Sequence, residues 1–131
     1  MSNKPKNKEE LSEELRHVAH EGGTEAPFTG KYWNSHEMGM FHCAVCGTEL
    51  FSSDTKFDSG TGWPSFASPA NLENIELKKD LSLGMLRMEV VCKNCGAHLG
   101  HVFDDGPKEK GGKRYCINSI CLDLKKQEDK K

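Results

Sequence analysis

The sequence has 131 residues, of which 35% are hydrophobic and 6 are cysteines, and its formal net charge is −2. A chain of this length is expected to form one domain with a real core, and its balanced charge excludes a global basic field for nucleic acid or anionic membranes. It has no apolar run of roughly 18 residues and no apolar core of a signal peptide, so we expect a protein of the reducing cytoplasm.

The N-terminal part is predicted to be helical. Residues 1–7 are polar and are expected to form a disordered tail. From residue 8 onward, apolar side chains recur at the spacing of an amphipathic helix, and the pair Gly22–Gly23 is expected to end that helix. The apolar positions are Leu11, Leu15, Val18 and Ala19.

Beyond Tyr32 the helical period gives way to short strands separated by turn-forming residues. The predicted fold is therefore mainly β, with one domain over residues 8–123 and a solvated, charged tail over residues 124–131. The predicted strands are residues 39–43, 49–52, 75–77, 85–91, 98–103 and 114–118.

Four cysteines form two Cys-x-x-Cys pairs, each followed directly by glycine. The pairs are Cys43 with Cys46 and Cys92 with Cys95. Four thiolates at this spacing are typical of a closed, structural zinc site, which here would tie two separate hairpin turns together. Redox-active dithiols are less favoured, because neither pair opens a helix in a βαβ unit. A catalytic zinc centre of the deaminase type is also less favoured, because its His-x-Glu motif is absent.

Cys116 is the candidate nucleophile among the remaining two cysteines. If residues 114–118 form a strand, Arg114, Cys116 and Asn118 lie on one face of it. A cation beside the thiol would favour the thiolate, which is the reactive form. By itself, an isolated buried cysteine is more often inert packing than a nucleophile.

His98 and His101 are candidates for proton transfer. In a plain strand the two would face opposite ways, so at most one could approach Cys116 unless Gly100 bends the chain. The alternative for both is hydrogen bonding within the core or behind the reactive residues.

Five motifs occur in a fixed order along the chain. They are Thr24-Glu25-x-Pro27-Phe28-Thr29-Gly30, the first Cys-x-x-Cys pair, Gly62-Trp63-Pro64-Ser65-Phe66, the run from Gly100 to Pro107, and Arg114-Tyr115-Cys116-Ile117-Asn118-Ser119. This ordered set resembles methionine sulfoxide reductase B, the family that reduces methionine-R-sulfoxide, over about residues 8–123.

The resemblance implies two antiparallel β-sheets, one structural Zn²⁺ held by the paired cysteines, and Cys116 as the catalytic residue. It also implies a site lined by further catalytic and substrate-binding residues, namely His98, His101, Asn118, Trp63, Phe103 and Arg114. The expected protein is a monomeric, cytoplasmic peptide-methionine (R)-S-oxide reductase, which repairs oxidised proteins under oxidative stress and uses thioredoxin or a small thiol.

The chemistry fits these residue types independently of the resemblance. A sulfoxide sulfur is electrophilic once its oxygen is protonated, so Cys116 would attack it while His101 delivers the proton directly or through a water. Methionine would leave and Cys116 would become a sulfenic acid. Trp63 offers an apolar face for the S-methyl group, whereas Phe66 is expected to belong to the core.

Two positions depart from the family pattern. Thr61 stands where many members carry a resolving cysteine, and Cys121 stands where serine is common. Five strand residues span roughly 16–17 Å, whereas a disulfide needs Cα atoms about 4.4–6.8 Å apart. We therefore expect the reductant to act directly on Cys116, with Cys121 packed as a small hydrophobe.

Two other interpretations compete with the enzyme. A zinc-ribbon binding module would explain the paired cysteines, but it would also predict a basic, aromatic-rich face that the composition lacks. A zinc-stapled interaction domain would bury Cys116 as an inert thiol. Alkylation distinguishes these interpretations, because a functional Cys116 is expected to react readily near neutral pH.

Overall fold

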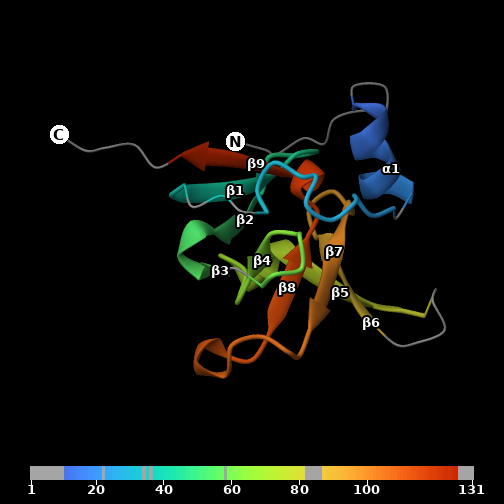
Figure 1. The fold of residues 1–131 in the computed structure, drawn as a ribbon. Helices are drawn as coiled ribbons and strands as arrows, with labels where there is room; N and C mark the ends of the chain where they lie inside the picture. Colours follow the sequence, from blue (N-terminus) through green and yellow to red (C-terminus); the bar gives the residue numbers. More distant parts are fainter. Residues whose placement is uncertain are drawn as a thin grey trace.

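The computed structural model describes residues 11–21, 23–33, 35, 37–57, 59–81 and 87–126. Within them it has two antiparallel sheets and one α-helix, which confirms the predicted fold class (Figure 1). The strand order is β2-β1-β9 in the smaller sheet and β3-β4-β8-β7-β6-β5 in the larger one. The strands are β1 (Gly39–Cys43), β2 (Glu49–Ser52), β3 (Lys56–Phe57), β4 (Ser65–Phe66), β5 (Ile75–Asp80), β6 (Arg87–Cys92), β7 (His98–Phe103), β8 (Arg114–Ile117) and β9 (Leu122–Lys126).

The helix α1 (Glu13–Glu21) begins after Ser12, whose hydroxyl accepts a hydrogen bond of 3.1 Å from the Leu15 N–H. A serine in this position satisfies one of the free N–H groups at a helix start. The helix ends directly before the predicted glycine pair, and Leu15, Val18 and Ala19 are buried on its inner face as predicted. Leu11, which was predicted to belong to the helix, is also buried but lies before its first residue. It packs against β7 and against the 3-10 turn η5 (Ser119–Cys121).

Three predicted strands, β1, β2 and β7, have the bounds that the sequence indicated, and β8 is one residue shorter. Residues 85–86 of the predicted fourth strand lie outside the described residues, and β6 begins at Arg87. Residues 1–7 and 127–131, assigned to the tails, also lie outside the described residues.

The sequence analysis missed β3, β4 and β9. The first two have only two residues each, too few to show any period. The strand β9 runs along β1 and includes residues 124–126, which the sequence assigned to the charged tail. Its Leu122 and Leu124 alternate with charged neighbours, so it presents one apolar side to the molecule.

The two turns that carry the paired cysteines have the same geometry. Gly47 and Gly96 have φ angles of 82° and 79°, and their N–H groups donate to the carbonyl oxygens of Cys43 and Cys92 at 2.8 and 2.7 Å. Such left-handed backbone favours glycine, which explains the residue after each pair. One turn joins β1 to β2 and the other joins β6 to β7, so the cysteines lie between the two sheets.

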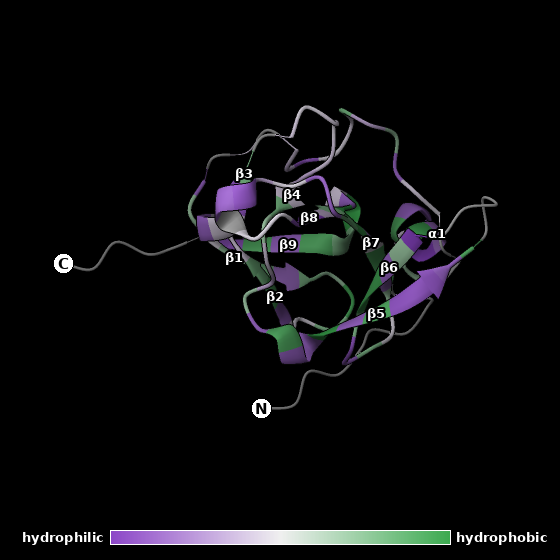
Figure 2. Ribbon diagram, turned by 90° about the horizontal axis from the view of Figure 1, so that it is seen from below, coloured by the Kyte–Doolittle hydropathy of each residue, from purple (hydrophilic) through white to green (hydrophobic). Residues whose placement is uncertain are grey.

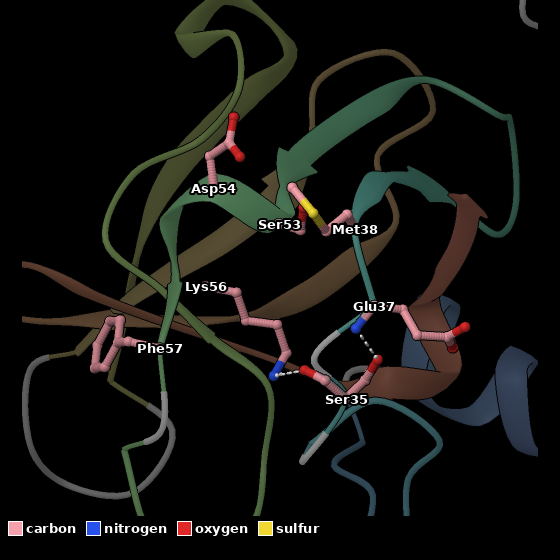
Figure 3. A pocket seen from close by; sticks show the side chains of 7 residues that line it. All are labelled: Ser35, Glu37, Met38, Ser53, Asp54, Lys56 and Phe57. Atoms are coloured by element: carbon pink, nitrogen blue, oxygen red, sulfur yellow. Dashed lines mark hydrogen bonds between the residues drawn. The ribbon is translucent and has the colours of Figure 1, made fainter. Parts of the chain in front are cut away.

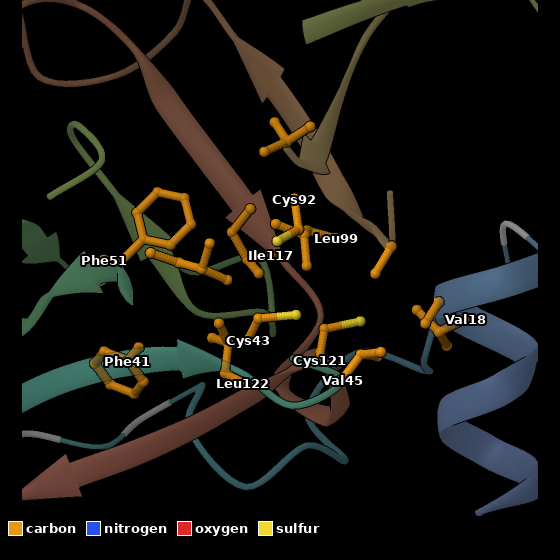
Figure 4. Packing of buried hydrophobic residues seen from close by; sticks show 14 of the residues in the cluster. Val18, Phe41, Cys43, Val45, Phe51, Cys92, Leu99, Ile117, Cys121 and Leu122 are labelled. Carbon is orange, nitrogen blue, oxygen red and sulfur yellow. The ribbon is translucent and has the colours of Figure 1, made fainter. Parts of the chain in front are cut away.

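An aromatic cluster forms much of the core. Phe66 of β4 stacks on Phe51 at a centroid distance of 4.5 Å and meets Phe41 edge-on at 5.3 Å. All three side chains are fully buried, as expected for Phe66. Figure 4 shows Val18 reaching from α1 toward the side of the core that holds Cys121. Figure 2 shows that β5, by contrast, is mostly hydrophilic.

Among the described helices, none has the length and apolar character needed to cross a membrane.

Candidate active site and metal centre

A β-bulge in β7 decides where the two histidines point. Val90 and Val91 are consecutive in β6 but pair with Gly100 and His98, so Leu99 is an extra residue in β7. An extra residue reverses the alternation of side chains beyond it. His98 and His101 therefore lie on the same side of the sheet, with ring centroids 5.4 Å apart, although a plain strand would separate them.

Cys116 lies at the centre of a row across the larger sheet. It pairs with His101 of β7 on one side and with Ser65 of β4 on the other. Directly paired residues project to the same face, so the thiol and the imidazole are cross-strand neighbours. Gly100 permits this approach, because a Cβ atom there would overlap the carbonyl oxygen of Cys116.

A cavity of about 210 Å³ opens on this face. It brings together every predicted catalytic or substrate-binding residue except His98. These residues are Trp63, His101, Phe103, Arg114, Cys116 and Asn118, and the remaining lining residues are Thr24, Thr61, Arg87 and Gly100. As the alternation in β8 predicted, Arg114 and Cys116 face the cavity while Tyr115 and Ile117 are buried on the other side.

Burial dominates the electrostatics of Cys116. Loss of solvent raises the pKa of its thiol above 9.0, and the nearby Arg114 guanidinium and Thr61 hydroxyl offset this rise only in part. The resting site therefore favours the thiol, in contrast to the thiolate expected from Arg114 alone. Any reaction at Cys116 must remove or transfer this proton.

His101 is held by a carboxylate behind it. Its Nε2 lies 2.7 Å from Oδ2 of Asp80, which also accepts a 3.2 Å hydrogen bond from Arg87. The pKa of His101 is below 6.5, because burial outweighs the opposing effect of Asp80. In the neutral ring the Nε2–H donates to the carboxylate, and Nδ1 is left as a proton acceptor.

His98 lies behind His101, outside the cavity lining. Its Nδ1 is 2.7 Å from Oε2 of Glu89, and its Nε2 is buried without a hydrogen-bond partner among the described residues. The side chain is only 7% exposed. This position suits a residue that supports the His101 ring rather than one that meets substrate.

Asn118 and Trp63 are both tied to the backbone of Glu25. The Asn118 amide accepts a 3.0 Å hydrogen bond from the Glu25 N–H and donates one of 2.9 Å to the carbonyl oxygen of Leu99. The Trp63 indole donates to the Glu25 carbonyl oxygen at 3.0 Å. These bonds fix the indole at the edge of the cavity and attach the segment around Glu25 to the bulge.

Arg114 is oriented by two contacts. Its guanidinium makes hydrogen bonds of 2.8 and 3.2 Å to the carboxylate of Asp105, and it stacks over the Phe103 ring at 4.6 Å. The carboxylate raises the pKa of Arg114 further, so the residue is a permanent cation beside the thiol.

The four paired cysteines form a separate cluster between the sheets. Their sulfur atoms all lie within 4.8 Å of one another, with Cys43 to Cys95 at 3.7 Å and Cys46 to Cys92 at 3.6 Å. These separations are far longer than the roughly 2.05 Å of a disulfide. Such a cluster of thiols can hold a metal ion.

Comparison with known proteins agrees with this geometry. A family model described as SelR domain matches residues 11–126. Proteins named peptide methionine sulfoxide reductase MsrB are 54% identical over 124 residues in Methanosarcina barkeri and 55% identical over 119 residues in Methanosarcina mazei and in Acinetobacter baumannii. The alignments cover 95%, 91% and 91% of this chain and 87%, 84% and 85% of those proteins.

The chain belongs to the methionine sulfoxide reductase B family. The resemblance drawn from the motifs is therefore confirmed.

The two departures from the family pattern lie at different distances from the cavity. Thr61 lines it, and its hydroxyl contributes to the environment of the Cys116 thiol. Cys121 is 1% exposed, and its thiol donates to the carbonyl oxygen of His98 at 3.3 Å. The turn η5 does bend the chain between the two cysteines, yet it directs Cys121 into the core (Figure 4).

The sequence analysis missed Asp80, Arg87 and Glu89, which orient the histidines. Arg87 and Glu89 are two positions apart in a predicted strand and therefore share a face, which could have indicated a charged surface beside the histidines. Asp80 reaches the site only because it pairs with Arg87 across β5 and β6.

Proposed function

We propose that this protein reduces methionine-R-sulfoxide in peptides and proteins to methionine. The observation that carries the proposal is the pairing of Cys116 with His101 inside a cavity walled by Trp63 and Phe103. A thiol nucleophile, a proton carrier and an apolar wall are what transfer of an oxygen atom from a methyl sulfoxide requires.

The first step transfers oxygen from the substrate to the enzyme. The sulfur of Cys116 attacks the sulfoxide sulfur, and the thiol proton passes to the sulfoxide oxygen. The substrate S–O bond and the transient S–S bond then break as the oxygen passes to the Cys116 sulfur, so methionine leaves, Cys116 becomes a sulfenic acid, and no proton is gained or lost overall. His101 is suited to relay this proton, because its lowered pKa favours the neutral ring and the contact of Nε2 with Asp80 leaves Nδ1 as the nitrogen that can accept a proton.

The apolar wall provides the preference for one sulfur epimer. Trp63 is fixed by its hydrogen bond to Glu25, so its ring gives the S-methyl group a rigid face. The R sulfoxide is then held with its oxygen toward His101. In the S epimer, bound with its methyl group on the same wall, the oxygen would point away from His101.

We propose that the cysteine cluster holds one structural Zn²⁺. Tetrahedral zinc with bonds of about 2.3 Å separates sulfur atoms by about 3.8 Å, close to the 3.6 and 3.7 Å found here. None of the four cysteines lines the reaction cavity. Bound zinc would hold the turns of the two sheets together.

A thiol reductant, such as thioredoxin or a small dithiol, is proposed to act directly on the Cys116 sulfenic acid. Two thiols would be oxidised to a disulfide while the sulfenic acid returns to the thiol and releases water. Burial of Cys121 and the hydroxyl at Thr61 support this route. A reducing compartment such as the cytoplasm would supply the reductant, and repair of oxidised proteins would be the result.

The test is turnover of R and S sulfoxide peptides separately, with dithiothreitol, by the native chain and by Cys116→Ser. We expect reduction of the R epimer alone and its loss in the variant. Cys121→Ser serves as the matched control, since it removes a thiol outside the cavity. If neither epimer reacts while zinc stays bound, the proposal is wrong and a binding module becomes the better interpretation.

A further inference from the structure

A second cavity, of about 370 Å³, adjoins the reaction cavity. Thr61 and Arg114 line both cavities, so the two lie side by side. The reaction cavity is small and suits a single side chain, whereas a peptide substrate carries further residues on both sides of the methionine sulfoxide.

The second cavity has an apolar component on each side. Phe57 comes from β3, and Pro107 comes from the loop between β7 and β8. Phe57 is half-buried, and Figure 3 shows its ring directed away from the Lys56 ammonium and from Ser35. Lys56 lines a different, polar cavity, which Phe57 also borders, and Lys56 is not among the residues that line the second cavity.

Among the described residues that line the second cavity, the two charged side chains, Asp105 and Arg114, are paired with each other. The carboxylate of Asp105 is 65% exposed, but both of its oxygens accept hydrogen bonds from Arg114. A charged substrate side chain would have to compete with this pair. An apolar side chain, by contrast, gains from contact with the rings of Phe57 and Pro107.

Both walls are organised before substrate binds. On one side, the Ser59 hydroxyl bonds to the hydroxyls of Thr61 and Ser65 at 2.8 and 2.7 Å. On the other, Gly112 accepts from the Gly106 N–H at 3.1 Å and donates to the Pro107 carbonyl oxygen at 2.9 Å. A preformed surface costs little ordering entropy when it binds.

We propose that this second cavity, in which Phe57 and Pro107 lie among the polar residues Ser59, Thr61, Asp105 and Arg114, is a flanking subsite that binds an apolar side chain next to the methionine sulfoxide. An extended peptide advances about 3.3 Å per residue, so residues close to the methionine sulfoxide in sequence are the ones that can reach a neighbouring cavity. The inference rests on the proposed function and assigns it a sequence preference among oxidised peptides.

The test uses acetylated pentapeptides with methionine-R-sulfoxide at the centre and glycine elsewhere, in which leucine replaces each glycine in turn. We expect leucine at one position to raise kcat/KM roughly 5- to 10-fold over the all-glycine peptide. Phe57→Ala should abolish most of this ratio, and Phe57→Leu should retain it. Because the readout is a ratio within one variant, general damage to the site cancels.

Leu72→Ala is the matched control, because Leu72 is a large apolar residue, 72% exposed, that lines neither cavity. It should keep the native ratio. The subsite would be overturned if the native enzyme had the same kcat/KM for every peptide, or if Phe57→Ala kept the preference for leucine over glycine. A greater gain in kcat/KM from lysine or glutamate than from leucine would also overturn it. Failure to reduce even the all-glycine peptide would instead count against the proposed reductase function.

Discussion

Asp80 and His101 share a hydrogen bond of 2.7 Å between Oδ2 and Nε2, which fixes the tautomer of the histidine that lines the reaction cavity. The same carboxylate binds Arg87, which also faces the cavity. A residue of β5 that is not among those lining the cavity thus determines which nitrogen of the His101 ring can accept a proton.

Asp80→Asn is expected to lower the pKa of His101 further below 6.5. The hydrogen bond to the Asp80 carboxylate, and to a smaller extent its charge, raise this pKa, while burial, Arg87 and His98 lower it. Titration of the ring by nuclear magnetic resonance would measure the shift. Asp104→Asn is the control, because Asp104 is exposed and pairs with Lys113. An upward shift in Asp80→Asn would contradict the assignment.

The lowered pKa of His101 in the native protein also has a consequence for stability. Since the unfolded chain binds a proton on His101 more readily than the folded chain, the contribution of His101 to the free energy of unfolding is expected to fall as the pH drops below 6.5. This loss should extend to lower pH in Asp80→Asn, where the folded pKa is lower still. Urea unfolding at a series of pH values would measure the difference between the two proteins.

Alkylation of Cys116 is expected to be slow at neutral pH and to accelerate as the pH rises, so rapid reaction near neutral pH no longer separates a functional Cys116 from a packed one. Burial raises the pKa of the thiol, and Arg114 opposes this rise. Arg114→Met should therefore raise the pKa further and slow alkylation at every pH below it. The rate with iodoacetamide, followed by mass spectrometry, provides the measurement.

Lys113→Met is the control for that series, since it removes a neighbouring cation that is exposed and bound to Asp104. It should leave the alkylation profile unchanged. Fast modification of Cys116 at pH 7, as first expected from the arginine alone, would show that the site stabilises the thiolate more strongly than its burial allows.

Sequence patterns were sufficient where the determinants are local. Helical spacing identified the buried face of α1, and the Cys-x-x-Cys spacing identified the four thiols that the fold brings together. The alternation in β8 placed Arg114 and Cys116 on one face. Each of these depends on residues close in the chain.

The remaining features depend on pairing between strands. The bulge at Leu99 arises from the register of β7 against β6, so the common orientation of the two histidines could not be predicted from their own strand. The contact between Asp80 and His101 likewise needs three neighbouring strands. The raised pKa of Cys116 reflects burial by the whole fold, which a list of nearby charges does not include.

Metal removal is expected to destabilise the protein without altering the reaction cavity. The four cysteines lie in turns of different sheets, so loss of zinc would release both turns. Cys92→Ser should abolish zinc binding and lower the Tm by on the order of 10 °C, corresponding to a few kcal/mol. Zinc content and thermal unfolding are the two measurements.

Cys121→Ser is the control for the metal experiment, because Cys121 is a buried thiol outside the cluster. It should retain one zinc per chain. An unchanged Tm in Cys92→Ser, or zinc lost equally in both variants, would contradict a structural site at the four cysteines.

Cys121 is expected to take no part in regenerating the enzyme. Its thiol is buried, burial raises its pKa strongly, and its hydrogen bond to the His98 carbonyl directs it into the core. After one turnover without reductant, Cys116 should be trapped by dimedone as a sulfenic acid, and peptide mapping should find no disulfide between the two cysteines. Serine can make the same hydrogen bond, so Cys121→Ser should keep the native rate with thioredoxin as reductant. A disulfide formed in good yield, or a large fall in that rate, would mean that η5 unfolds during the cycle and brings Cys121 to the cavity.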